Sequence, residues 1–133
     1  YGMGPMECYR DKHHAASHSS YTATVWQLHE DYIRPQENGS HFDCDYVMLA
    51  GDAVRLTAVG TQPFSFNASH YTQEELTRKA HNYELEPCGS TVLCLDYAQN
   101  GIGSESCGPR LLEQYRLDDA AFDFGLRLIP EKK

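Results

Sequence analysis

The sequence has few basic residues, no long apolar run and no paired cysteine motif. It holds 11 Lys and Arg against 19 Asp and Glu in 133 residues, a formal net charge of −8. Nucleic acids and anionic membranes bind concentrated positive surface, so this balance argues against both as partners. No apolar run reaches the roughly 18 residues of a membrane span, and no secretory signal peptide is recognisable. A neutral or cationic ligand, or another protein, is the expected partner.

Cysteine is scarce, and its pattern argues against a disulfide framework. An odd count without a CxxC pair predicts free thiols in a reducing compartment, and hence a cytoplasmic location. The length fits one domain and is too short for a TIM barrel, which needs about 250 residues. The chain starts at Tyr1 rather than at methionine, which predicts a piece of a longer polypeptide. The cysteines are Cys8, Cys44, Cys88, Cys94 and Cys107.

Regular periodicity is missing from the first part of the chain. Residues 1–39 show neither a helical nor an alternating apolar period, which predicts an extended arm that wraps a surface. After it, short stretches of β-branched and aromatic residues alternate with turn signals, which predicts sandwich strands over residues 40–133. In the first strand, alternation would place Phe42, Cys44, Tyr46 and Met48 on one face. The strands are expected at residues 41–49, 53–60, 63–69, 83–87, 90–98, 112–118 and 120–130.

A single short helix is predicted near residues 72–81. Thr72, followed three residues later by Glu75, forms a capping-box pattern. Arg78 and Lys79 suit the C-terminal end of a helix dipole. Many short strands with one helix indicate an all-β protein, an antiparallel β-sandwich with one short α-helix.

No constellation of residues identifies a catalytic site. Glycoside hydrolysis uses two carboxylates about 5–9 Å apart, and the spacing of the many carboxylates here selects no pair. A nucleophilic cysteine needs a positioned base, and no histidine is indicated as the base for Cys107. His13, His14 and His18 lie close in sequence, but without helical periodicity a solvated tract is favoured over a metal site.

The segment QNGIGSESCGP, residues 99–109, is rich in glycine. Because no helix follows its GxG pattern, turn geometry is favoured over a phosphate site. Either the segment is a plain surface loop, or its backbone passes close to another group. Asp96 and Tyr97 before it, and Arg110 after it, could line a sugar-sized pocket.

Several segments in order resemble one family, the C-terminal small-chain region of the β-galactosidases of glycoside hydrolase family 2. The matching features extend over nearly the whole chain, and their order makes the resemblance specific. They are Gly4-Pro5 with Glu7 and Tyr9, residues 35–39, Phe66-Asn67 with Tyr71, His81, and residues 101–103.

The resemblance implies a piece of a long, multidomain bacterial enzyme. In such enzymes a TIM barrel with two glutamates hydrolyses terminal non-reducing β-D-galactose residues with retention. The small-chain region is implied to be a β-sandwich of the mutarotase-like supersandwich type. It would pack on the catalytic barrel, help to shape the galactoside-binding site and be inactive alone. No cofactor is expected in this domain, and Mg²⁺ and Na⁺ would be used through other domains of the parent.

The resemblance also implies that the 99–109 loop reaches the sugar. Its substrate-pocket residues would be Gly103, Glu105, Ser106 and Cys107, with Cys107 where some relatives have a tryptophan. A thiol lacks the apolar face that an aromatic ring offers to a sugar. Residues 40–45 also depart from many relatives, which have arginines there. A sandwich that lacks part of its strands exposes a sheet edge, which predicts some dimer formation by the isolated chain.

Two other functions are compatible with the residues. A self-standing carbohydrate-binding module would use exposed aromatic side chains, and Trp26, Tyr21, Tyr32 and Tyr46 are available for that role. A mutarotase-type enzyme is suggested by analogy of fold alone, and fold does not fix function.

Overall fold

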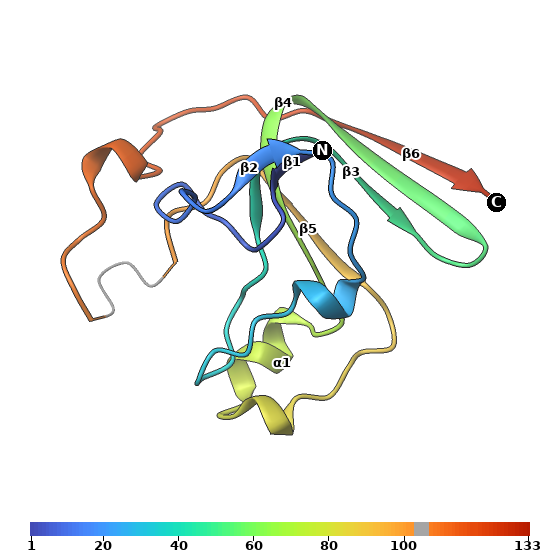
Figure 1. The fold of residues 1–133 in the computed structure, drawn as a ribbon, viewed down its shortest axis with the longest axis horizontal. Coiled ribbons are helices and arrows are strands. Elements are labelled where there is room, and N and C mark those ends of the chain that lie inside the picture. The colour runs from blue at the N-terminus through green and yellow to red at the C-terminus, as the bar shows by residue number, and fades with distance from the viewer. Residues whose placement is uncertain (103–106) are drawn as a thin grey trace.

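The computed structural model describes residues 1–102 and 107–133, and a four-stranded antiparallel sheet is its main feature (Figure 1). The strands are β3 (His41–Ala50), β4 (Val54–Ser69), β5 (Val92–Asp96) and β6 (Leu126–Lys132). The long strand β4 is central. It pairs with β3 on one side. On its other side, its first half pairs with β6 and its second half pairs with β5.

The first forty residues lie against this sheet. They contain the short antiparallel pair β1 (Gly2–Gly4) and β2 (Ser17–Ser19), followed by the 3-10 turn η1 (Val25–Leu28). The backbone of Tyr1 bonds to both Asp45 and Tyr46 of β3. Gly2 packs so closely on Cys44 that an added Cβ would overlap the Cys44 side chain. The N-terminal segment therefore adds to the open side of β3.

The core lies where the strands of the main sheet meet. Cys44, Val47, Ala58 and Phe64 are buried there, and four half-buried apolar side chains pack around them. The face predicted for β3 is wrong, because Val47 is buried whereas Tyr46 and Met48 are exposed. The reason is a β-bulge: the register of β3 shifts between residues 41 and 46, which reverses the alternation. The half-buried residues are Phe66, Leu95, Phe124 and Leu126.

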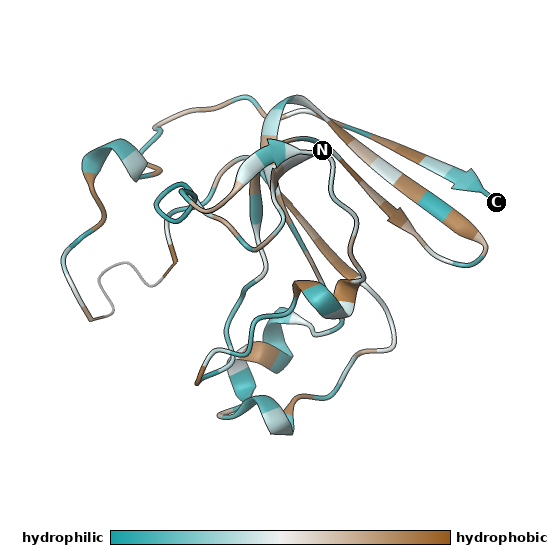
Figure 2. Cartoon of the chain, viewed as in Figure 1, coloured by the Kyte–Doolittle hydropathy of each residue, from teal (hydrophilic) through white to brown (hydrophobic). Residues whose placement is uncertain are grey.

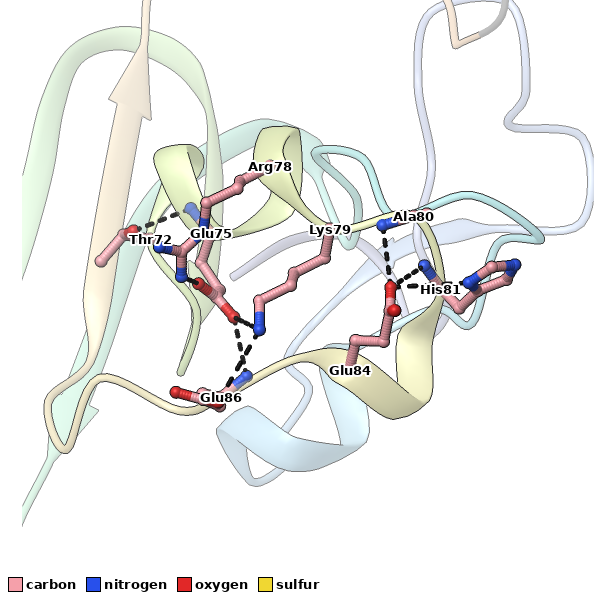
Figure 3. A network of polar contacts seen from close by, with 8 residues as sticks. All are labelled: Thr72, Glu75, Arg78, Lys79, Ala80, His81, Glu84 and Glu86. Carbon is pink, nitrogen blue, oxygen red and sulfur yellow. Dashed lines mark hydrogen bonds and ion pairs between the residues drawn. The ribbon is translucent and has the colours of Figure 1, made fainter.

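The predicted helix is present as α1 (Gln73–Arg78), a short element with Thr72 as its N-cap. The Thr72 hydroxyl accepts a hydrogen bond from the Glu75 N–H at 3.2 Å. The Glu75 carboxylate instead contacts Arg78, Lys79 and the N–H of Glu86 (Figure 3). The strands and this helix confirm the predicted all-β class, an antiparallel sandwich with one short α-helix.

Four of the predicted strands are merged or replaced in the structure. The strands expected at 53–60 and 63–69 are one continuous strand, β4, which passes through Pro63. The stretch at 83–87 contains the 3-10 turn η2 (Asn82–Glu84), and the stretch at 112–118 contains η3 (Glu113–Tyr115). No helix in the described part of the chain is long and apolar enough to cross a membrane.

One end of the main sheet extends beyond the rest of the molecule. It consists of the β3–β4 hairpin and β6, and Figure 1 shows it projecting away from α1 and the N-terminal segment. Apolar residues continue along it, as Figure 2 shows. Met48, Val54 and Leu128 are exposed there, at 46%, 57% and 54%. We call these three residues and their strands the apolar sheet end.

Candidate functional site

A buried carboxylate organises the N-terminal segment. Glu7 is only 4% exposed. Its Oε1 accepts hydrogen bonds from Lys12 Nζ, at 2.7 Å, and from the Tyr32 hydroxyl. Its Oε2 accepts from the Gly39 N–H at 2.8 Å and from the Tyr9 hydroxyl at 3.3 Å. These five residues form what we call the Glu7 cluster, in which the charge of a buried carboxylate is fully compensated.

The electrostatics of the Glu7 cluster favour fixed protonation states. Burial raises the pKa of Glu7, but hydrogen bonds from Lys12, Tyr32 and Gly39 outweigh it and leave this pKa below 4.5. Burial, followed by the neighbouring Glu7, raises the pKa of Tyr32 to about 12 and that of Tyr9 further. Glu7 is therefore ionised and its partners are protonated at neutral pH. None of them has the pKa near 7 that suits a general acid or base.

Two further segments that carry the family resemblance, residues 35–39 and the one with Asn67, meet beside this cluster. The Asn38 side chain accepts a hydrogen bond from the Glu30 N–H at 2.9 Å. The Asn67 amide, on β4, donates to Glu37 at 2.9 Å and to the Asn38 carbonyl at 3.4 Å. The chain folds this way because the buried polar groups of residues 35–39 need partners, and the arm and β4 provide them.

The aromatic residues considered for sugar stacking do not share one platform. Tyr32 is held by Glu7, Tyr21 bonds to Ser17, and the Tyr46 ring stacks on Tyr1 at 6.2 Å. Trp26 is the most accessible of the four, at 55% exposed, and its ring centroid lies 4.4 Å from that of His70. A continuous aromatic row is therefore not formed by these four residues.

The 99–109 loop begins at well-anchored residues. The Gln99 side chain donates to Asp96 at 2.9 Å, and the Leu117 N–H donates to the Asn100 side chain at 2.7 Å. Burial raises the pKa of Asp96, and the bond from Gln99 opposes this. Tyr97 stacks on Phe122 with ring centroids 4.4 Å apart. Asp96 and Tyr97 are thus engaged with neighbouring residues of their own chain.

Of the predicted substrate-pocket residues, only Cys107 falls among the described residues. It is exposed. Gly103, Glu105 and Ser106 lie outside the described residues. The glycine-rich loop was expected to be either a plain surface loop or a segment whose backbone passes close to another group. At Gly101 the second holds, because an added Cβ would overlap the carboxyl group of Asp11. Sequence reasoning missed Asp11, because nothing in the sequence around it indicates a contact ninety residues away.

The other candidate groups are dispersed. The rings of His13 and His14 stack at 4.8 Å, and His18 lies 3.0 Å from the Asp43 carbonyl. Among the described residues, no group of three or more His, Cys, Asp or Glu side chains could hold a metal ion. All five cysteines are free, as their odd number predicts.

A shallow hollow of about 460 Å³ lies beside η3. Its lining residues are Leu112, Glu113 and Gln114. Among the described residues this lining provides one carboxylate, whereas hydrolysis of a glycoside requires two. The hollow therefore does not form a glycosidase site from these residues.

The chain is similar along almost its whole length to known proteins. A family described as "Beta galactosidase small chain" matches residues 1–128. The β-galactosidase of Actinobacillus pleuropneumoniae is 50% identical over 132 residues, which cover 99% of this chain and 13% of that protein. The β-galactosidase of Staphylococcus xylosus is 41% identical over 128 residues, 96% of this chain and 13% of that protein. That of Kluyveromyces lactis is 33% identical over 124 residues, 92% of this chain and 12% of that protein.

Proposed function

This chain belongs to the β-galactosidase small-chain family, and from that premise we propose that it is a non-catalytic domain of a larger β-galactosidase. It packs on the catalytic barrel and helps to shape the galactoside-binding site. The parent hydrolyses terminal non-reducing β-D-galactose residues with retention, through two glutamates on the barrel. The observation that supports this most is that the chain matches relatives over nearly all of its length but only 12–13% of theirs.

The state of the two buried carboxylates supports a non-catalytic role. Glu7, the most buried carboxylate described, is saturated with donors and has a pKa below 4.5. Glu75 is also buried, and its pKa is lowered, first by the Glu86 N–H and then by Arg78 and Lys79 (Figure 3). A catalytic pair instead requires one carboxyl group with a raised pKa facing a second, ionised carboxylate across a sugar.

The apolar sheet end supports packing against other polypeptide. Met48 and Leu128 lie on opposite faces of the three strands, because Met48 is in register with Thr57, and Leu128 with the buried Ala58. An isolated sheet end with apolar side chains on both faces is unfavourable in water. The remainder of the parent enzyme is the partner that we place there.

The finer assignment follows the resemblance. We place the domain at the C-terminal end of a glycoside hydrolase family 2 enzyme, as part of a mutarotase-like supersandwich. The Mg²⁺ and Na⁺ of the parent belong to its other domains. The bacterial cytoplasm is the location that five free thiols support, because that compartment keeps cysteines reduced.

The proposed role of the 99–109 loop can be tested through Cys107. In the parent enzyme, Cys107→Trp adds an aromatic face beside the sugar, so we expect KM for a chromogenic β-galactoside to fall about threefold. Cys107→Ala should change KM by less. Cys88→Trp is the matched control, because Cys88 is also exposed but lies far away in the sequence. If both tryptophan variants have wild-type KM and kcat, the loop does not contact the sugar.

The exposure of Trp26 favours a second candidate function, a carbohydrate-binding module. Trp26 is the only tryptophan in the chain and is 55% exposed, so its fluorescence reports on that position alone. Titration of residues 1–133 with galactose or lactose should leave the emission unchanged if the chain acts only as a domain of the parent. A saturable shift, abolished in Trp26→Phe, would favour the binding module instead.

A further inference from the structure

The start of the 99–109 loop lies directly on the N-terminal segment. A Cβ added to Gly101 would overlap the Cγ and both carboxyl oxygens of Asp11. By contrast, a Cβ added to Gly108, near the other end of the loop, would meet no atom of the described residues within 4 Å. The need for glycine is therefore different at the two positions, although both belong to the same loop.

Asp11 is held in place by its own neighbours. Tyr9 and Lys12 exchange backbone hydrogen bonds of 3.0 and 2.9 Å, so Arg10 and Asp11 form the tip of a closed turn. Lys12 is further tied to Glu7 by the 2.7 Å ion pair. These bonds fix the backbone around Asp11, and so fix the point from which its carboxyl group extends toward Gly101.

The polar environment of Asp11 indicates that this contact is tight. Its Oδ1 atom is inaccessible to solvent and has no hydrogen-bond partner among the described residues. A carboxylate oxygen that can move would turn toward water, because an unsatisfied buried oxygen costs about 1–3 kcal/mol. The backbone at Gly101 covers it instead, while the neighbouring Asn100 is held by the Leu117 N–H.

From these contacts we propose that Asp11 is a positioning residue for the 99–109 loop. Its carboxyl group occupies the space that a side chain at residue 101 would need, and so sets where the loop backbone starts. The Glu7 cluster fixes the turn, the turn fixes Asp11, and Asp11 fixes Gly101. The effect of this chain of contacts on the sugar rests on the proposed function, in which the loop borders the galactoside.

The test is a set of variants in the parent enzyme, read by hydrogen exchange over residues 99–109 and by galactosidase kinetics. Gly101→Ala should speed exchange in the loop and raise KM about tenfold, because a displacement of about 1 Å is costly at an active site. Gly108→Ala is the matched control and should leave both readouts within about twofold of wild type.

A double variant separates positioning from general damage. Asp11→Gly removes both the overlapping atoms and the support that they give, so by itself it should speed exchange in the loop, and Gly101→Ala should then add little to its effect. Asp11→Asn keeps the same shape without the charge, so it should leave exchange close to wild type and should not reduce the effect of Gly101→Ala. Strongly non-additive effects of this kind are expected only for residues in contact.

The outcomes decide between the possibilities. If Gly101→Ala behaves like Gly108→Ala, if Asp11→Gly alone leaves exchange at wild type, or if the effects of the two substitutions simply add, the positioning role is overturned. If exchange shows the losses and the non-additivity while KM and kcat stay at wild type, the positioning role stands and the proposed function fails, because the loop then does not border the sugar.

Discussion

At the scale of single residues, Glu7 is the position where a small change should have the largest effect. Glu7→Gln removes the ion pair with Lys12 and places an amide among four donors. Breaking a buried ion pair costs about 3–5 kcal/mol, and because Lys12 is half exposed we expect about 3 kcal/mol. Urea denaturation of residues 1–133 measures this. Glu113→Gln, at an exposed position, is the control, and equal losses in the two variants would contradict the assignment.

His41 should make the domain sensitive to mild acid. Burial lowers its pKa below 6.5, although the Met3 carbonyl and Glu7 oppose the shift. As pH falls from 6.5 toward the folded-state pKa, the unfolded chain takes up a proton that the folded chain does not, so stability falls. Glu7 acts later: its lowered pKa means that its contribution is lost as pH falls below 4.5.

The measurement is the urea midpoint of residues 1–133 between pH 7.5 and 5. His41→Gln keeps a side-chain N–H for the Met3 carbonyl, which accepts from His41 at 3.0 Å, but cannot titrate. We therefore expect the midpoint of wild type to fall across this range, and that of His41→Gln to fall less. Parallel curves for the two proteins would show that His41 is not the titrating group.

Residue identity alone predicted part of the site. The glycine-rich loop was recognisable because repeated glycines indicate a sharp or crowded backbone path. Its neighbour Asp11 was not, because an isolated aspartate carries no signal of a distant contact. Glu7 was noted only within the family resemblance, since a single glutamate reads as a surface charge until its donors are brought together.

At the scale of elements, residues 35–39 show how one glycine can fix a turn. Gly39 has a φ of 70°, and an added Cβ would overlap the Leu28 carbonyl oxygen. Gly89 has a similar φ of 73°, but its Cβ would meet no described atom within 4 Å. The two glycines therefore separate backbone strain from steric overlap.

We expect Gly89→Ala to cost about 1 kcal/mol, the strain of a left-handed residue alone. Gly39→Ala adds overpacking against η1 and should cost at least about 3 kcal/mol in total. Urea denaturation of residues 1–133 gives both values. Equal costs would mean that the backbone at residue 39 moves away from Leu28 easily.

Element prediction succeeded where the signal was local. The start of α1 followed from the Thr72 cap, and β3 and β5 followed from their β-branched and apolar residues. It failed at the bulge in β3, where the backbone of Tyr1, distant in sequence, bonds to Asp45 and Tyr46. It also failed at the turn η2, although the contacts there are short-range: Glu84 accepts hydrogen bonds from the Ala80 and His81 N–H groups, as Figure 3 shows.

At the scale of the whole molecule, the open side of β6 bears on the predicted dimer. The Gly125 carbonyl accepts a hydrogen bond from the Thr61 N–H of β4, and the Lys133 N–H donates to the Ala53 carbonyl. Backbone groups of alternate residues along β6 therefore face β4, and those of the residues between them face the open edge. Pro130, which pairs with Leu56, is one of the latter, so its nitrogen, which has no hydrogen to donate, faces the open edge. Proline at that position disfavours pairing with another strand, so edge-to-edge association through β6 is the less favourable route.

The apolar sheet end is the alternative route to self-association, and it gives the last prediction. Leu128→Lys should reduce association of isolated residues 1–133, because a charge then replaces exposed apolar surface. In the parent enzyme the same change should lower the thermal midpoint, since there we expect other polypeptide to cover Leu128. Sedimentation velocity and thermal unfolding measure the two effects. Glu131→Lys is the control, because Glu131 lies on the same strand and loses only a weak 4.0 Å ion pair with Arg55. A strictly monomeric wild-type chain at high concentration, together with an unchanged midpoint in the parent, would show that this surface meets only solvent.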